Sequence, residues 1–226
     1  MNRLTFIQGA GGVYTHHQGW SWLTSRDKRL RFWQFYRQHH PKSRTVYGQF
    51  PIQKILHDNS YSIEHIIPHS ELKRQLHGKM ENGASINPFN LIPAHQEINK
   101  ARGSSAFDFD NDPLESTLPL LSKRRKKSYQ SGFDADGEWI VPPRSRGEIA
   151  RSILYMLLCY PLNDLYADHH QSLINWAQKD IPSKIEQDYN AWVAHKWKIK
   201  NPLIESPEIL DQPSFLYSLQ EAFPPC

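Results

Sequence analysis

Cysteine is nearly absent from this 226-residue chain, which contains two, at positions 159 and 226. Two cysteines cannot build the disulfide framework of a small secreted scaffold, and neither has a Cys or His neighbour at the spacing of a zinc site. Cys159 lies in an apolar run and is expected to be a buried thiol, whereas Cys226 is the last residue. This cysteine usage is typical of a reducing compartment.

Long hydrophobic runs are also missing. No stretch approaches the roughly 18 apolar residues of a membrane-spanning helix, and residues 1–17 lack the apolar segment of a signal peptide. We therefore expect a cytoplasmic protein with no membrane partner, although the mature form of a secreted or periplasmic protein would look similar. Hydrophobic residues make up 38% of the chain and aromatic residues 12%, enough for the packed core of a single domain over residues 1–226.

Negative charge is in deficit, with 23 acidic against 27 basic residues and a formal net charge of +4. A basic surface attracts polyanions, of which nucleic acid is the commonest. The densest positive charge is a run of five residues that is either a solvated loop or a set of phosphate contacts. This basic run consists of Lys123, Arg124, Arg125, Lys126 and Lys127.

Hydrophobic periodicity and turn residues predict an α+β fold that is mostly helical. Tyr61–Ile67 is predicted to be a strand that ends at Pro68, and Asn82-Gly83 is predicted to be a turn before a second extended run at 87–93. We divide the chain into a strand–turn–strand–helix core at about 60–103, a basic excursion at about 104–145 with a hairpin near 133–141, and a C-terminal helical part at about 146–204. Helices are predicted at 26–40, 51–59, 94–102, 146–160, 169–179 and 184–198.

Two adjacent residues on the predicted strand, Glu64 and His65, suit the hydrolysis of a phosphodiester. That reaction needs a base to deprotonate water and a cation to offset charge on the phosphate. Imidazole is a good base near neutral pH, and Mg²⁺ prefers carboxylate and amide oxygens as ligands. Neighbouring side chains on a strand point to opposite faces, so Glu64 is expected to face a metal and His65 the attacking water. An amide such as Asn90 would complete the metal site, and a helix carrying Asn99 would pack over the pair.

Three blocks of sequence resemble the endonuclease I family of non-specific bacterial nucleases, which belongs to the His-Me finger (ββα-metal) superfamily. The block SIEHIIPHS at 62–70 is similar to the family's "EH-apolar-x-P" strand, and NPFNLIPAHQEINKARGSSAF at 87–107 resembles its "xNLxPAxxxVNxxRSNxxF" segment. The block VPPRSRGEIARSILYM at 141–156 resembles "PPxxxRGxIARxxxYM", and IKNPLI at 199–204 is a weaker echo of a C-terminal "NPFI". The resemblance implies a ββα-metal motif embedded among helices.

Matched position by position, the resemblance implies that Glu64 and Asn90 ligate one Mg²⁺, which Mn²⁺ or Ca²⁺ can replace in binding, and that His65 is the general base. Arg102 either contacts phosphate or braces the helix, and Asn99 orients the motif through hydrogen bonds to backbone. The implied activity is endonucleolytic cleavage of double-stranded DNA, with single-stranded DNA or RNA as further substrates, to give 5′-phosphate and 3′-hydroxyl ends.

Other residues near the motif are expected to be structural. Arg146 and Arg151, which match the third block, are expected to form ion pairs. His95 is expected to be solvated, with DNA contact as the alternative.

The chain departs from the family in two ways that bear on its role. Secreted members use several disulfides, which this chain cannot form, and the basic run is not part of the family pattern. An unrestrained nuclease in a cytoplasm would cut the host genome. The alternatives are therefore a site-specific type II restriction endonuclease with a companion methylase, a nuclease held by an inhibitor protein, and an exported enzyme. From another class, a non-catalytic DNA-binding protein with a degenerate nuclease fold stays open, although the presence of all three key residues argues against it.

Overall fold

The computed structural model describes residues 25–109, 132–134, 136–162 and 165–221. The basic run at 123–127 lies outside the described residues, so its predicted contact with nucleic acid stays a prediction. No helix in the described ranges is long and apolar enough to cross a membrane.

The described residues form a mostly helical α+β fold, which confirms the predicted fold class. Two short sheets are present, each an antiparallel pair of strands. In chain order the elements are α3 (Ser25–His39), α4 (Ile52–His57), β1 (Tyr61–His65), α5 (His69–Gln75), α6 (Lys79–Ile86), η1 (Pro88–Asn90), β2 (Leu91–His95), α7 (Gln96–Arg102), β3 (Gly132–Phe133), β4 (Trp139–Ile140), α8 (Pro143–Cys159), η2 (Ala167–His169), α9 (His170–Lys179), α10 (Lys184–Trp197), α11 (Pro202–Glu205), η3 (Pro207–Asp211) and α12 (Pro213–Glu221).

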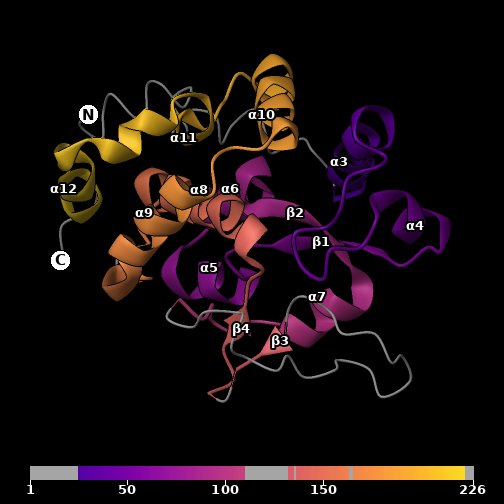
Figure 1. Cartoon of the computed structure of the whole chain (residues 1–226), viewed down its shortest axis with the longest axis horizontal. Helices are drawn as coiled ribbons and strands as arrows, with labels where there is room; N and C mark the ends of the chain where they lie inside the picture. The colour runs from indigo at the N-terminus through magenta and orange to yellow at the C-terminus, as the bar shows by residue number, and fades with distance from the viewer. Residues whose placement is uncertain (1–24, 110–131, 135, 163–164, 222–226) are drawn as a thin grey trace.

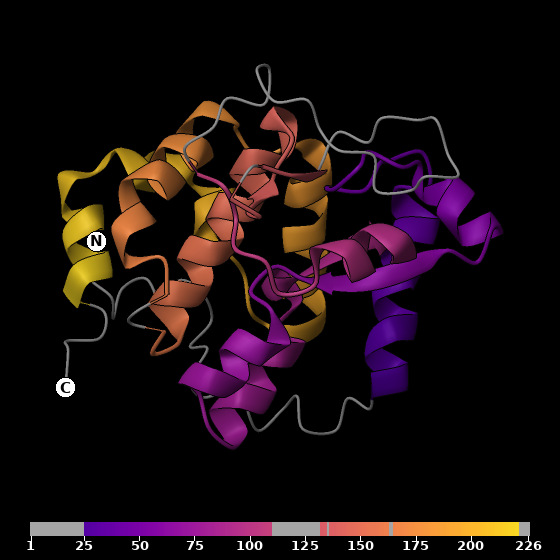
Figure 2. The ribbon, with the colours of Figure 1, turned by 90° about the horizontal axis from the view of Figure 1, so that it is seen from below.

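Helix α8 is the centre of the hydrophobic core. From Ile149 to Cys159 every one of its residues is buried, including the thiol of Cys159, as predicted. A helix that is buried on all sides must be covered by other elements, and α9 packs along it. Figures 1 and 2 show the β1–β2 sheet between α3 and α4 on one side and α8 and α9 on the other.

A buried ion pair explains the arginine and glycine of the third sequence block. Arg151 on α8 donates hydrogen bonds of 2.8–2.9 Å to the carboxylate of Glu186 on α10, and both side chains are buried. Gly147 lies one turn earlier, and a Cβ there would come within 2.0 Å of the carbonyl oxygen of Asp180. The glycine therefore allows α8 to approach the end of α9 closely. The expected ion pair of Arg151 is confirmed, whereas Arg146 stacks on Trp176, with its guanidinium carbon 4.8 Å from the ring centre.

Two local predictions are wrong. Asn82-Gly83 lies inside α6, because Gly83 and Ala84 are buried there and packing outweighs the turn preference of the pair. The extended run predicted at 87–93 is a 3₁₀ turn, η1, followed by the strand β2. The hairpin predicted near 133–141 is present as β3 and β4.

Candidate active site

Strands β1 and β2 and helix α7 form a ββα unit at residues 61–102. Tyr61 pairs with His95 and His65 with Leu91, so the two strands are antiparallel in full register. Helix α7 starts directly after β2, and the ring of His95 caps it by accepting a hydrogen bond from the amide of Glu97. His95 is 4% exposed and stacks on Phe50, so the expectation that it is solvated is wrong.

Asn99 connects α7 to β1. Its amide nitrogen Nδ2 donates to Oγ of Ser62 at 2.8 Å and to the carbonyl of Ile63 at 3.2 Å. The side chain is half-buried. The two hydrogen bonds fix the orientation of the amide, and its oxygen Oδ1 lies at the other end of the group. The contact with Ile63 is the backbone hydrogen bond expected of Asn99.

Glu64 and His65 differ in burial, as alternation along a strand requires. Glu64 is 4% exposed, whereas His65 is half-buried. Burial raises the pKa of the Glu64 carboxyl, and the nearby Arg102 guanidinium opposes this shift. The carboxylate is ion-paired to Arg102, so its charge is compensated inside the protein.

Arg102, the last residue of α7, braces the end of β1. Its guanidinium donates to the carbonyl oxygens of His65 and Ile66, both at 2.9 Å, and lies 4.3 Å from the centre of the Phe107 ring. The side chain is completely buried. Of the two roles predicted for Arg102, the geometry supports bracing, because a guanidinium enclosed in this way does not reach a substrate phosphate.

His65 is oriented by a carbonyl group from α6. Its Nε2 lies 2.9 Å from the backbone oxygen of Ser85, which can only accept a hydrogen bond. In the neutral ring the proton is therefore on Nε2, and the basic lone pair is on Nδ1. A neighbouring ring, that of His69, stacks on His65 with a centroid separation of 6.0 Å. The contact with Ser85 was not predicted, because a backbone carbonyl twenty residues away leaves no trace in the sequence.

Asn90 is enclosed, and both ends of its side-chain amide contact backbone groups. Its Oδ1 accepts from the amide of Ile67 at 2.8 Å, and its Nδ2 donates to the carbonyl of Ile67 at 3.2 Å. The residue is 0% exposed. This arrangement clamps the chain just after β1, and it counts against the predicted role of Asn90 as a metal ligand.

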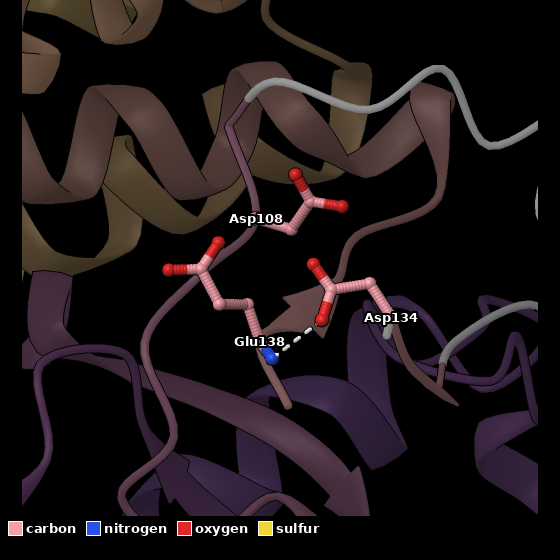
Figure 3. A group of neighbouring side chains, drawn as sticks. All are labelled: Asp108, Asp134 and Glu138. Atoms are coloured by element: carbon pink, nitrogen blue, oxygen red, sulfur yellow. Dashed lines mark hydrogen bonds between the residues drawn. The ribbon is translucent and has the colours of Figure 1, made fainter. Parts of the chain in front are cut away.

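An acidic cluster that sequence reasoning missed lies beside the hairpin. The carboxylates of Asp108, Asp134 and Glu138 come within 4.8 Å of one another (Figure 3). Oδ1 of Asp134 accepts hydrogen bonds from the amides of Asp136 and Glu138, which holds the turn between β3 and β4. Carboxylates in this arrangement are candidate cation ligands, but the Asp134 carboxylate already stabilises the turn through its hydrogen bonds. The cluster contains none of the metal ligands predicted from the sequence.

The fold and the site place an acidic residue and a histidine side by side at the end of a strand in a ββα unit. The family model described as Endonuclease I matches residues 5–208, which is most of the chain. The chain therefore belongs to the endonuclease I family and is a nuclease. A search of curated proteins found none that matches it.

Proposed function

We propose that this nuclease is a metal-dependent endonuclease of double-stranded DNA, with His65 as its general base. The observation that carries the proposal is the hydrogen bond from Nε2 of His65 to the carbonyl of Ser85, which leaves Nδ1 as the basic nitrogen. The imidazole would take a proton from the attacking water at Nδ1. The Ser85 carbonyl would keep the ring in place and stabilise the imidazolium that forms.

Oxygen donors on β1 and α7 fit a hard divalent cation. The Glu64 carboxylate is one, and the Asn99 amide oxygen is the other, because Nδ2 of Asn99 is held by β1. We propose this pair as the ligands of one Mg²⁺ in place of Glu64 and Asn90. When bound, the cation would offset charge on the scissile phosphate and stabilise the leaving 3′ oxygen. Arg102 would keep the carboxylate and the strand end in position.

The proposed products carry 5′-phosphate and 3′-hydroxyl ends. The cytoplasmic location, the action on single-stranded DNA or RNA, and a companion methylase or inhibitor stay predictions from the sequence.

The test is cleavage of a supercoiled plasmid by the wild type and by His65→Ala, each with Mg²⁺ and with EDTA. The wild type with Mg²⁺ should degrade the plasmid to a smear, and His65→Ala should be slower by about 10²–10⁴-fold, the usual contribution of a general base. The matched control is His57→Ala, because His57 is an exposed histidine at the end of α4, 3.0 Å from Asp58. This control should cleave like the wild type.

Each alternative gives a different gel. A wild type that shifts the plasmid without cutting it would identify a non-catalytic DNA-binding protein. Discrete bands in place of a smear would identify a site-specific restriction endonuclease. Cleavage that persists in EDTA would contradict metal dependence, and His65→Ala at wild-type rate would contradict the assignment of the base.

A further inference from the structure

His69 lies beside His65, the proposed base, and has no role in the proposed proton transfer or metal binding. It is the first residue of α5, and its ring plane is inclined by 26° to that of His65 at a centroid separation of 6.0 Å. Its Nε2 is 3.4 Å from Oε1 of Glu81 on α6, and 47% of its side chain is exposed. One ring nitrogen is thus held by a carboxylate, while about half of the side chain is open to solvent.

Helix α6 contacts both imidazoles, one through a backbone carbonyl and the other through a side-chain carboxylate. The Ser85 carbonyl contacts Nε2 of His65, and the Glu81 carboxylate contacts Nε2 of His69. Residues 81 and 85 are four apart, so they lie one turn from each other along the helix. The two rings are therefore fixed through equivalent nitrogens, with Nδ1 as the remaining nitrogen of each ring.

We propose that His69 is a second substrate-contacting residue, which donates a hydrogen bond from Nδ1 to a phosphate oxygen of the DNA bound at His65. This inference rests on the proposed function. A protonated imidazole carries two N–H donors, and Glu81 holds only one of them. A water in contact with His65 lies about 3 Å from the ring and about 3 Å from the phosphorus that it attacks. Oxygens of that phosphate therefore fall within reach of a ring stacked on His65.

The alternative explanation of the same contacts is a purely structural one, in which His69 and Glu81 only join α5 to α6. An exposed ion pair of this kind contributes at most about 1 kcal/mol to stability and nothing to DNA binding. The two explanations differ in the salt dependence of binding, because each phosphate contact made by a cation releases counterions from DNA. One such contact adds about 0.9 to the slope of log affinity against log salt concentration.

The experiment measures binding of a fluorescent DNA duplex by anisotropy over a series of salt concentrations, in EDTA to prevent cleavage, at about pH 6. The proteins are the wild type, His69→Ala, His69→Gln, His69→Lys and the control His57→Ala, which removes another histidine paired with a carboxylate. We expect His69→Ala and His69→Gln to lose about 0.9 from the magnitude of the slope and to bind about tenfold more weakly, as for the loss of one charged hydrogen bond. His69→Lys and His57→Ala should keep the wild-type slope.

A His69→Ala slope equal to those of the wild type and His57→Ala would overturn the inference and leave the proposed function standing. If His69→Ala fails to fold, as judged by circular dichroism, His69→Gln decides: a wild-type slope in that variant overturns the inference, and a reduced slope that His69→Lys restores supports it. A wild type that binds no DNA at any salt concentration and cuts none with Mg²⁺ would overturn both the proposed function and this inference.

Discussion

Arg102 holds Glu64 in an ion pair inside the protein, and the same guanidinium binds the backbone of the next two residues. The side chains of Arg102 and Glu64 are 0% and 5% exposed. The carbonyl oxygens of His65 and Ile66 accept the other hydrogen bonds of the guanidinium. One buried cation therefore fixes the proposed metal ligand and the backbone of the proposed base together.

Removal of the Arg102 guanidinium should strongly destabilise the protein. Arg102→Ala leaves a buried carboxylate without its counter-charge and two carbonyls without their donor, so we expect a loss of about 3–5 kcal/mol in the free energy of unfolding. The control is Arg74→Ala, because Arg74 forms an exposed pair with Glu71 on α5 and should cost no more than about 1 kcal/mol. Urea denaturation measures both changes. Similar losses in the two variants would refute the bracing role of Arg102.

The tautomer of His65 can be observed without mutation. The hydrogen bond to the Ser85 carbonyl predicts that the neutral ring carries its proton on Nε2. Long-range ¹H–¹⁵N spectra of protein labelled at histidine nitrogen distinguish the two tautomers, with His65→Ala used to assign the signal. They should be recorded at about pH 8, where an ordinary imidazole is neutral. Observation of the Nδ1–H tautomer would contradict the assignment of Nδ1 as the base.

Asn90 and Asn99 should respond differently to substitution. Asn90→Ala deprives the buried amide and carbonyl of Ile67 of their partners, so the protein should lose about 1–3 kcal/mol of stability for each unsatisfied group. Asn99→Ala should unfold closer to the wild type, since the residue is half-buried, but should need a higher Mg²⁺ concentration for half-maximal cleavage. Urea denaturation and Mg²⁺ titration of plasmid cleavage separate the two effects. A raised Mg²⁺ requirement confined to Asn90→Ala would restore Asn90 as the metal ligand.

The sequence was sufficient for the ββα unit, because its signals are local. The alternation of side chains along a strand predicts that Glu64 and His65 face different surroundings, and they differ in burial. The groups around that pair could not be predicted in the same way. The Ser85 carbonyl has no side-chain signature, and the clamp made by Asn90 depends on how the chain turns after β1. The Asn82-Gly83 prediction failed because burial within α6 outweighed local turn preference.

Glu148 should make stability depend on pH. It lies on α8 and lines a cavity of about 20 Å³, room for about one water molecule, together with Glu186, Tyr36 and Tyr189. Burial, and secondarily the charge of Glu186, raise the pKa of Glu148 to about 8, with Arg151 opposing the shift. We therefore expect the folded protein to hold a proton on Glu148 at neutral pH, whereas the unfolded chain, with an ordinary value of 4.5, loses it.

A carboxyl with a raised pKa in the folded state stabilises the protein fully below about pH 4.5, and this stabilisation is lost as the pH rises through about 8. Glu148→Gln mimics the protonated acid, so it should be more stable than the wild type at about pH 9. The gain is at most about 5 kcal/mol, since each pKa unit between 4.5 and about 8 corresponds to about 1.4 kcal/mol, and solvent at this partly exposed side chain lowers it. Urea denaturation from about pH 5 to pH 9 measures the slope. In Glu148→Gln the free energy of unfolding should still change with pH, but less than in the wild type, because burial also raises the pKa values of Glu64 and Glu186. The control is Glu208→Gln, at an exposed position, which should show the same pH dependence of stability as the wild type. If stability depends on pH in Glu148→Gln as it does in both of these proteins, Glu148 is ionised in the folded protein.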